Sequence, residues 1–474
     1  MILINNTRRF MSSTSANFRL AKEFVVLPLL ILPLFLMAIN CSFAQDTTTA
    51  TAQKTTPAKT WIDLSTGHRV TRLTGEPNSV GLYFDANAYT PDGLDMVYTS
   101  HTGIYSLNLS TQQAILLVDG KQYMISGVVV GTKTRRVFFQ KYLDRNVYAV
   151  DIDTKKVTQV AALPYRANLS TVNADETLLA GTYIEGSAPG YEQYKAEALL
   201  DSSKEFSIEH SAHPDELVDK NKSNESIAKA HAVATEKYYA SHTPEDIFTV
   251  NIQTGQIKTI LKGTDWLNHV QFSPTDPTLL MYAHEGPSLK VDRIWTIRAD
   301  GSNNKLIRQR MDPSEIATHE FWSHDGKTIW YDLQTSKGED FAIGGYKVES
   351  GKEVAYHMNK AEASVHYNIS TNDRFFCSDG NESAHDNKAG IHGHMMLQRE
   401  WIKILRPFPD DSLHSIRLVD LSKNDYARSE PNARFSPDNK MVIFTSNMFG
   451  PNYIFAVEVG KAKADSATST SASN

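Results

Sequence analysis

The chain has 474 residues, with 48 Lys and Arg against 54 Asp and Glu, a formal net charge of -6 and 41% hydrophobic residues. This balance lacks the basic surface on which nucleic-acid binding depends, so nucleic acid is not expected as a partner. Two cysteines, Cys41 and Cys377, are too few for a disulfide-stapled scaffold, so the stability of the fold has to come from its core.

Residues 1–44 have the layout of a secretory signal peptide. Basic residues precede an apolar stretch at residues 24–39, and small residues follow at 42–44. We therefore expect export to the periplasm or the cell exterior, with Gln45 near the start of the processed chain. Lipidation of Cys41 is the alternative. The apolar stretch is shorter than the ~20 residues of a spanning helix, so no stable membrane span is expected after processing.

One structural unit recurs within residues 61–460. An apolar strand leads into a polar turn, often spelled Ser-Pro-Asp-Gly, and a second apolar strand follows. Pro and Asp suit the early positions of such turns and Gly supplies positive φ, so the turns are chemically specified. The turns lie at residues 88–93, 130–133, 172–176, 272–276, 322–326, 369–373 and 435–439. Their spacing of about 41 to 50 residues, where no insertion intervenes, predicts an all-β fold, a seven-bladed β-propeller.

The two ends of this repeat region complement each other. Residues 61–70 read as the outer hairpin of a blade that precedes the first full unit, and residues 453–459 read as a last strand. Pairing these ends would complete the seventh blade and remove exposed sheet edges. The propeller is therefore predicted to be closed by its N- and C-terminal strands.

Four segments fall outside the repeat pattern. Residues 45–60 and 461–474 are rich in Thr, Ser and Ala and are expected to be a flexible linker and a flexible tail. Residues 185–245 and 379–400 are excursions too long for ordinary blade loops. Covering the substrate and contacting another subunit both stay open for them, and the sequence leaves the oligomeric state undetermined.

The repeat phase selects candidate site residues. His319 stands in a His-Glu-Phe-Trp run directly before a turn, His366 takes the matching place one blade later, and Asn432 precedes the last turn. Equivalent positions of successive blades converge on the central channel, so these side chains are expected to face one funnel. An imidazole there can exchange a proton near neutral pH. Taken alone, a histidine at this place could instead only hydrogen-bond between strands.

Four motifs together resemble the oligogalacturonate lyase family. They are residues 266–274, the His-Glu-Gly-Pro run at 284–287, residues 291–295 and the His-Glu-Phe-Trp run at 319–322. The resemblance extends from residue 61 to residue 459. It implies a seven-bladed propeller that cleaves short pectin oligomers by β-elimination and leaves a 4,5-unsaturated uronate.

The resemblance also implies roles for individual residues. His319 would be the proton-abstracting base, Arg293 would bind the acidic group of the substrate, and His366 would be a metal ligand. Glu430 and Asn432 stand where the family has further histidine ligands. Oxygen donors beside one imidazole still suit a hard cation, so Mn²⁺ is the expected cofactor, with Mg²⁺ or Ca²⁺ as alternatives.

Four further residues are expected to bind the acidic oligosaccharide substrate: His269, His284, Glu285 and Tyr83. For His284 and Glu285, shaping a turn is the open alternative. Two other functions also stay open, a lyase for another uronate-containing oligosaccharide and a non-enzymatic propeller scaffold. Clustering of His319, Arg293 and His366 would favour the enzyme, because a scaffold has no reason to gather them.

Overall fold

The computed structural model describes residues 59–462 except for several gaps. The gaps are residues 121–124, 142–144, 165, 187–232, 234, 336–339, 365, 381–400 and 427. The expected signal peptide, most of the linker and of the tail, and most of both excursions therefore lie outside the described residues.

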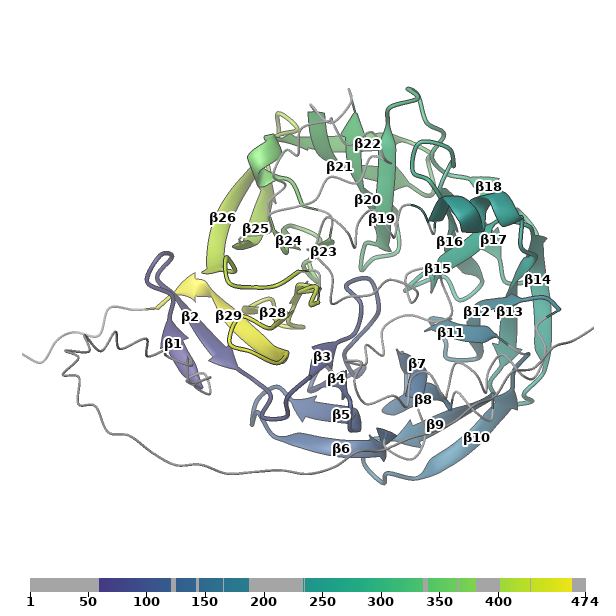
Figure 1. The fold of residues 1–474 in the computed structure, drawn as a ribbon, viewed down its shortest axis with the longest axis horizontal. Helices are drawn as coiled ribbons and strands as arrows, with labels where there is room; N and C mark the ends of the chain where they lie inside the picture. The colour runs from purple at the N-terminus through teal and green to yellow at the C-terminus, as the bar shows by residue number, and fades with distance from the viewer. Residues whose placement is uncertain are drawn as a thin grey trace, which may run out of the picture. The chain divides into compact units, whose positions relative to one another are not determined.

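The described strands form seven antiparallel sheets around a ring, and this confirms the predicted seven-bladed β-propeller (Figure 1). Blades 1 to 3 consist of β3 (Val80–Gly81), β4 (Asp95–Ser100), β5 (Gly103–Asn108) and β6 (Ala114–Asp119); β7 (Ile125–Val130), β8 (Arg136–Lys141), β9 (Asn146–Asp151) and β10 (Val157–Ala162); and β11 (Ala167–Val172), β12 (Leu178–Ile184), β13 (Glu245–Asn251) and β14 (Ile257–Gly263).

Blades 4 to 6 follow the same pattern, with the first strand of each blade innermost. They consist of β15 (Trp266–Phe272), β16 (Leu279–Glu285), β17 (Ile294–Arg298) and β18 (Lys305–Leu306); β19 (Ile316–Trp322), β20 (Thr328–Thr335), β21 (Asp340–Lys347) and β22 (Glu353–Met358); and β23 (Tyr367–Ile369), β24 (Phe376–Ser378), β25 (Trp401–Pro407) and β26 (Leu413–Asp420). A 3₁₀ helix, η3 (Lys360–Glu362), precedes blade 6.

Blade 7 is built from both ends of the repeat region. It contains β27 (Arg434–Phe435), β28 (Met441–Ser446) and β29 (Tyr453–Lys461), extended by β2 (His68–Arg72) and then β1 (Thr60–Ile62). Val70 pairs with Val457 in the antiparallel ladder that joins β2 to β29. The predicted closure is therefore confirmed, and β1 adds a fifth strand to this blade.

Each of the seven predicted turns joins the innermost strand of a blade to the next strand. The turn at residues 322–326 shows why its residue types are needed. The Ser323 hydroxyl donates to Asp325 Oδ1 at 2.7 Å and accepts from the Thr328 backbone N–H at 2.9 Å. Gly326 has φ of +67°, a conformation that costs glycine little. The turn therefore satisfies its own polar groups at the blade edge.

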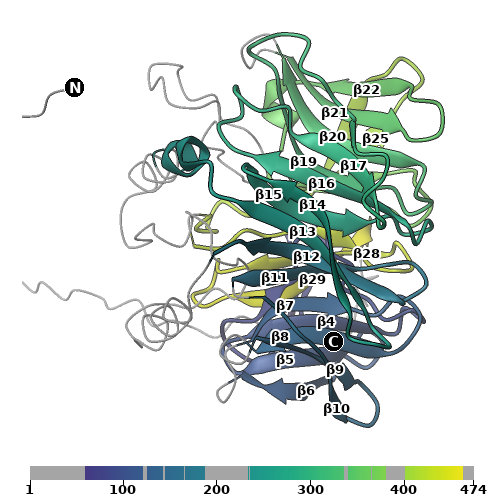
Figure 2. The same cartoon turned by 90° about the vertical axis from the view of Figure 1, so that its right-hand side faces the viewer.

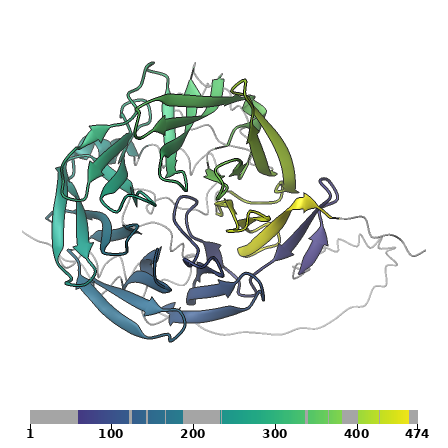
Figure 3. The same ribbon diagram turned by 180° about the vertical axis from the view of Figure 1, so that it is seen from behind.

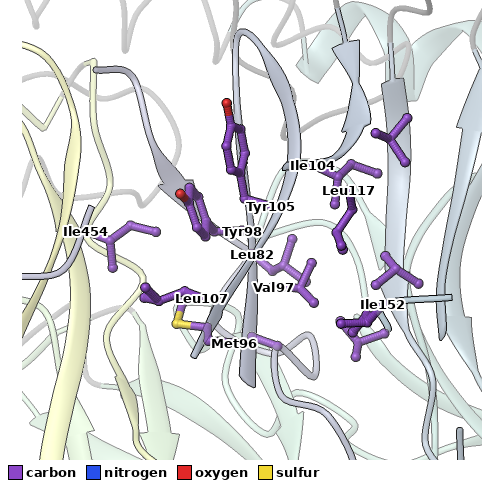
Figure 4. Packing of buried hydrophobic residues seen from close by; sticks show 14 of the residues in the cluster. Leu82, Met96, Val97, Tyr98, Ile104, Tyr105, Leu107, Leu117, Ile152 and Ile454 are labelled. Carbon is purple, nitrogen blue, oxygen red and sulfur yellow. The ribbon is translucent and has the colours of Figure 1, made fainter. Parts of the chain in front are cut away.

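Apolar side chains fill the spaces between neighbouring blades. Second strands such as β28 are buried along almost their whole length, which explains their unbroken apolar sequences. Figure 4 shows one interblade cluster, in which the Leu82 and Tyr98 side chains of blade 1 lie near Ile152, after β9, and Ile454 of β29. Each such buried apolar side chain contributes about 1.5–3 kcal/mol, so packing between blades holds the ring together.

Two segments lie outside the sheets. A short helix at residues 235–241 (teal) lies on one face of the ring (Figure 2). The loop that follows β3 (purple) reaches toward the centre of the ring, as the opposite view shows (Figure 3). Among the described residues, no helix combines the length and apolar character that crossing a membrane requires.

Candidate active site

Two histidines reach the centre of the ring from bulges in innermost strands. His269 in β15 has φ of +47° and His319 in β19 has φ of +52°, and the strand register shifts at each of them. Asn432, before β27, has φ of +49°. A bulge takes one side chain out of the normal alternation. Left-handed backbone at such residues costs about 1–3 kcal/mol and is typical of functional sites.

His319 is held by a buried carboxylate. Its Nδ1 lies 3.0 Å from Oδ1 of Asp332, and the Thr318 hydroxyl donates to the same oxygen at 2.6 Å. Burial lowers the pKa of His319, and the charges of His366 and Arg293 lower it further, while Asp332 acts in the opposite direction. The net shift is downward, so the ring is neutral near pH 7. With Nδ1 donating to Asp332, Nε2 is the basic nitrogen.

His366 repeats this arrangement one blade later. Its Nδ1 lies 2.9 Å from Oδ2 of Asp379, whose side chain is fully buried. The rings of His319 and His366 meet edge to face with their centroids 5.1 Å apart. The structure therefore brings together the two imidazoles that the repeat phase predicted, each oriented by its own aspartate.

Arg293 lies between two buried glutamates. Its Nη1 donates to Glu285 at 2.7 Å, and its Nε donates to Glu320 at 2.9 Å. Burial lowers the pKa of Arg293, but the two carboxylates outweigh it and raise the pKa further above the ordinary value. Burial alone would raise the pKa of Glu285, yet Arg293 and His269 hold it well below the usual range. The three side chains therefore form a largely buried charged network.

His269 belongs to the same network and is a cation. Its Nε2 lies 2.7 Å from Oε1 of Glu285, and its Nδ1 lies 3.8 Å from Oδ2 of Asp85. Burial lowers the pKa of His269, but these two carboxylates raise it to about 10. Asp85 is itself held by Gln271, whose Nε2 donates to it at 2.8 Å. At neutral pH, His269 therefore adds positive charge to that of Arg293.

The loop after β3 carries Tyr83, Phe84 and Asp85 into this cluster. The Tyr83 hydroxyl lies 3.4 Å from Nε2 of His366, and the Tyr83 ring centroid lies 5.7 Å from that of His269. Phe84 stacks on His366 with 4.9 Å between ring centroids. Burial raises the pKa of Tyr83 well above its ordinary value, and nearby carboxylates add to the shift. Tyr83 therefore keeps its proton.

Of the predicted metal ligands His366, Glu430 and Asn432, only the first two have side chains that face each other. Nε2 of His366 lies 3.9 Å from Oε2 of Glu430. Because Nδ1–H of His366 donates to Asp379, Nε2 carries the lone pair with which an imidazole binds a metal. The Asn432 amide oxygen instead accepts a hydrogen bond from the Phe84 backbone N–H at 3.1 Å. Among the described residues, no three His, Cys, Asp or Glu side chains are grouped closely enough to hold a metal ion. Of the three predicted ligands, His366 and Glu430 therefore face each other, whereas the Asn432 side chain is directed at the loop after β3.

His284 lies away from the cluster. Its ring stacks on Trp295 with centroids 4.9 Å apart, and its Nδ1 lies 3.4 Å from Asp265. Successive residues of a strand point to opposite faces, so Glu285 reaches Arg293 while His284 does not. Of the four predicted substrate-binding residues, the structure therefore brings together His269, Glu285 and Tyr83.

Several residues that sequence reasoning missed complete the site: Asp332, Asp379, Glu320, Asp85, Gln271 and Phe84. One signal was present for the first two. Asp332 lies 13 positions after His319, and Asp379 likewise lies 13 positions after His366. Repetition of the same spacing in successive blades indicates a paired site on adjacent strands.

The chain is similar in sequence to known proteins of one family. The model of the family described as oligogalacturonate lyase matches residues 229–463. A protein of Dickeya dadantii (strain 3937) named oligogalacturonate lyase is 23% identical over 417 residues, which cover 84% of this chain and 95% of that protein. An oligogalacturonide lyase of Pectobacterium atrosepticum is 23% identical over 412 residues, with the same coverage.

Solved structures show the same fold. An oligogalacturonate lyase in complex with manganese has a TM-score of 0.65 at 23% identity, and the match covers 85% of this chain and 96% of that one. The enzyme of that name from Vibrio parahaemolyticus has a TM-score of 0.63 at 24% identity with the same coverage. The family model, the two curated relatives and these two structures are therefore all oligogalacturonate lyases to which the chain is similar.

Proposed function

We propose that the protein is a lyase that cleaves short oligogalacturonides by β-elimination and releases 4,5-unsaturated uronate products. One observation carries the proposal. A neutral imidazole, His319, is oriented by buried Asp332 in a largely buried cluster that also holds the cations Arg293 and His269. A base beside fixed positive charge is what proton removal next to a carboxylate requires.

His319 performs the proton transfer. Its Nδ1–H donates to Asp332, so the Nε2 lone pair takes the proton from C5 of the uronate. The electron pair of that C–H bond forms the C4–C5 double bond, and the bond from C4 to the bridging oxygen breaks. The leaving oxygen then receives a proton from water. Because its pKa is lowered, His319 is unprotonated and competent at neutral pH.

The positive charges bind and activate the uronate carboxylate. Arg293 directs its Nε and one Nη1 N–H toward Glu320 and Glu285, and its Nη2 approaches Glu320 at 3.5 Å. A guanidinium has five N–H groups, so donors remain for a substrate oxygen. His269 adds a second charge. Loss of the C5 proton increases the negative charge on the carboxylate. A fixed cation therefore stabilises the transition state more strongly than it stabilises the ground state.

Mn²⁺ is the proposed cofactor, with Mg²⁺ or Ca²⁺ as alternatives. His366 and Glu430 would hold it, because their donor atoms face each other across 3.9 Å. The presence of manganese in the structure of a relative supports this choice. When bound, the cation would supply Lewis-acid stabilisation of the developing carboxylate charge.

An absorbance assay on digalacturonate and trigalacturonate tests the proposal. Formation of unsaturated product should be measured with chelator, with added Mn²⁺ and with neither. We expect product with the untreated protein, loss of it with chelator and recovery with Mn²⁺. If product forms only from another uronate-containing oligosaccharide, the protein is a lyase for that substrate instead. If no uronate gives product, the result favours a non-enzymatic propeller scaffold.

Two variants locate the chemistry. His319→Ala should lose product formation while keeping its fold, and His357→Ala is the matched control. His357 also contacts an aspartate through Nδ1 at 3.0 Å, but it lies half-exposed on blade 5. Near-normal turnover in His319→Ala would remove His319 from the mechanism.

A further inference from the structure

The backbone of residues 82–86 is held across the ring by side chains of other blades. This segment follows the two-residue strand β3 and carries Tyr83, Phe84 and Asp85 into the site. Buried backbone carbonyls need hydrogen-bond donors, and a loop that has left its sheet has to find them elsewhere. Here the donors come from β27 and β23, which lie in blades 7 and 6.

Arg434 supplies most of these donors. Its side chain extends from β27, and the residue is 3% exposed. Its Nη1 donates to the Ala86 carbonyl at 2.8 Å, and its Nη2 donates to the Tyr83 carbonyl at 2.6 Å and also to the Leu82 carbonyl. The planar guanidinium fork thus holds three carbonyls of one short segment from two separated nitrogens, a geometry that the single nitrogen of a lysine does not reproduce.

Asn368 holds the middle of the same segment. Its Nδ2 donates to the Phe84 carbonyl at 3.2 Å, and its Oδ1 accepts from the Phe435 backbone N–H at 3.3 Å. Asn368 therefore ties the loop to β27 as well. Together with Arg434, it fixes the backbone on both sides of Tyr83 and Phe84.

We propose that Arg434 and Asn368 are positioning residues. By fixing the backbone of residues 82–86, they place Tyr83 against His366 and Asp85 against His269. The inference rests on the proposed lyase function for its kinetic consequence, but not for its structural one. Both residues bind the backbone of the loop. Their effect on the reaction passes through the loop.

Release of the loop would break two of its contacts with the site histidines. If its carbonyls are released, the Tyr83 hydroxyl moves from Nε2 of His366, now 3.4 Å away, and Asp85 moves from Nδ1 of His269, now 3.8 Å away. His269 would then lose the carboxylate of Asp85 and keep Glu285, Arg293 and Tyr83 as its neighbours. Misplacement of site groups by about 1 Å can lower a rate on the order of 10²-fold.

The test compares three variants with the wild type. Arg434→Met removes the donors but keeps the length of the side chain, and Arg434→Lys keeps the charge. Asn368→Ala releases the Phe84 carbonyl and the Phe435 N–H but leaves the three carbonyls held by Arg434 in place. The matched control is Arg308→Met. Arg308 is also largely buried, 11% exposed, and pairs with Glu315 and Glu353 at blade positions that the loop does not contact.

Kinetics give the first measurement. We expect kcat of Arg434→Met to fall on the order of 10²-fold, with a smaller change in KM, partial recovery in Arg434→Lys and a smaller loss in Asn368→Ala. Arg308→Met should keep the wild-type kcat per folded molecule. Wild-type kcat in Arg434→Met, or an equal loss in Arg308→Met, would overturn the proposal.

A measurement that needs no activity separates this proposal from the proposed function. NMR of histidine-labelled protein gives the pKa of His269, whose signal is assigned by its loss in His269→Gln. The pKa should fall from about 10 in the wild type when Arg434→Met releases Asp85. An unchanged pKa would overturn the positioning role even if no substrate is turned over. If Arg434→Met does not fold, Asn368→Ala gives the same decision.

Discussion

Nδ1 of His319 lies 3.0 Å from Oδ1 of Asp332, whose side chain is 3% exposed. The same blade holds a second pair, His357 and Asp340, with the same 3.0 Å separation but with both side chains about half-exposed. The two pairs share their contact and differ in their surroundings. A comparison of variants in the two pairs therefore measures how burial changes the effect of an aspartate on its histidine.

Asp332→Asn should lower kcat on the order of 10²-fold or more with little loss of fold. The amide no longer fixes Nδ1 as the protonated nitrogen, so Nε2 is basic for only part of the time. Formation of unsaturated product gives the rate, and Asp340→Asn is the control. Equal rates for the two variants would show that orientation by Asp332 is not used.

The pH dependence should place the acid limb of kcat/KM below the ordinary histidine pKa of about 6.5. His319 has to be unprotonated to act, and its pKa is lowered chiefly by burial. Activity is therefore retained at neutral pH and lost as the pH falls through the lowered value. In Asp332→Asn, the influence that raises this pKa is gone, so the residual activity should extend to still lower pH. A limb that moves upward would contradict this assignment.

The ring was predictable from the sequence because each blade repeats its own turn chemistry. Ser323, Asp325 and Gly326 act within one turn, so local residues carry the information. Closure was predictable for the same reason, since residues 61–70 and 453–459 read as strands that lack neighbours in sequence. Interblade packing then follows from the apolar strands.

The site was predictable only where it follows the repeat. His319 and His366 keep the same phase before a turn, whereas Asp85 and Arg434 act across the ring on partners far away in sequence. No local pattern encodes such contacts. The position of Asn432 was predicted to serve a cation, but its amide oxygen bonds to Phe84, because a loop from blade 1 occupies that place.

The Arg293–Glu320 pair should be costly to break. Glu320 is fully buried and its carboxylate accepts from Arg293 at 2.9 Å, so Glu320→Gln leaves a buried charge with one partner fewer. Loss of one partner of a buried pair costs about 3–5 kcal/mol. Urea unfolding measures this free energy. Glu353→Gln, which removes the half-exposed partner of Arg308, should cost at most about 1 kcal/mol. Similar losses in both variants would contradict the distinction.

Binding of Mn²⁺ should depend on His366 and Glu430 but not on the Asn432 side chain. Titration calorimetry on the chelator-treated protein should show weaker binding in His366→Ala and Glu430→Gln. Asn432→Ala should bind Mn²⁺ as the wild type does, because its amide oxygen is directed to the Phe84 N–H. Loss of binding in Asn432→Ala comparable to that in His366→Ala would show that the amide turns to the metal.

Glu245 and Glu176 should make opposite contributions to stability. Burial raises the pKa of Glu245 to about 8, although the Leu267 N–H donates to its carboxylate at 3.1 Å. For Glu176, burial is outweighed by hydrogen bonds from the Thr134 hydroxyl, two backbone N–H groups and Arg136, which lower the pKa.

The signs follow from proton linkage. Between the ordinary value near 4.5 and about 8, folded Glu245 keeps a proton that the unfolded chain releases, so the free energy of unfolding falls as pH rises through that window. Glu245→Gln should therefore stabilise the fold at pH 8, with a gain that vanishes toward pH 4.5. Glu176 stabilises above its unfolded pKa, so Glu176→Gln should destabilise at neutral pH. Urea unfolding across this range measures both, and destabilisation by Glu245→Gln at pH 8 would show that its carboxylate is ionised in the folded protein.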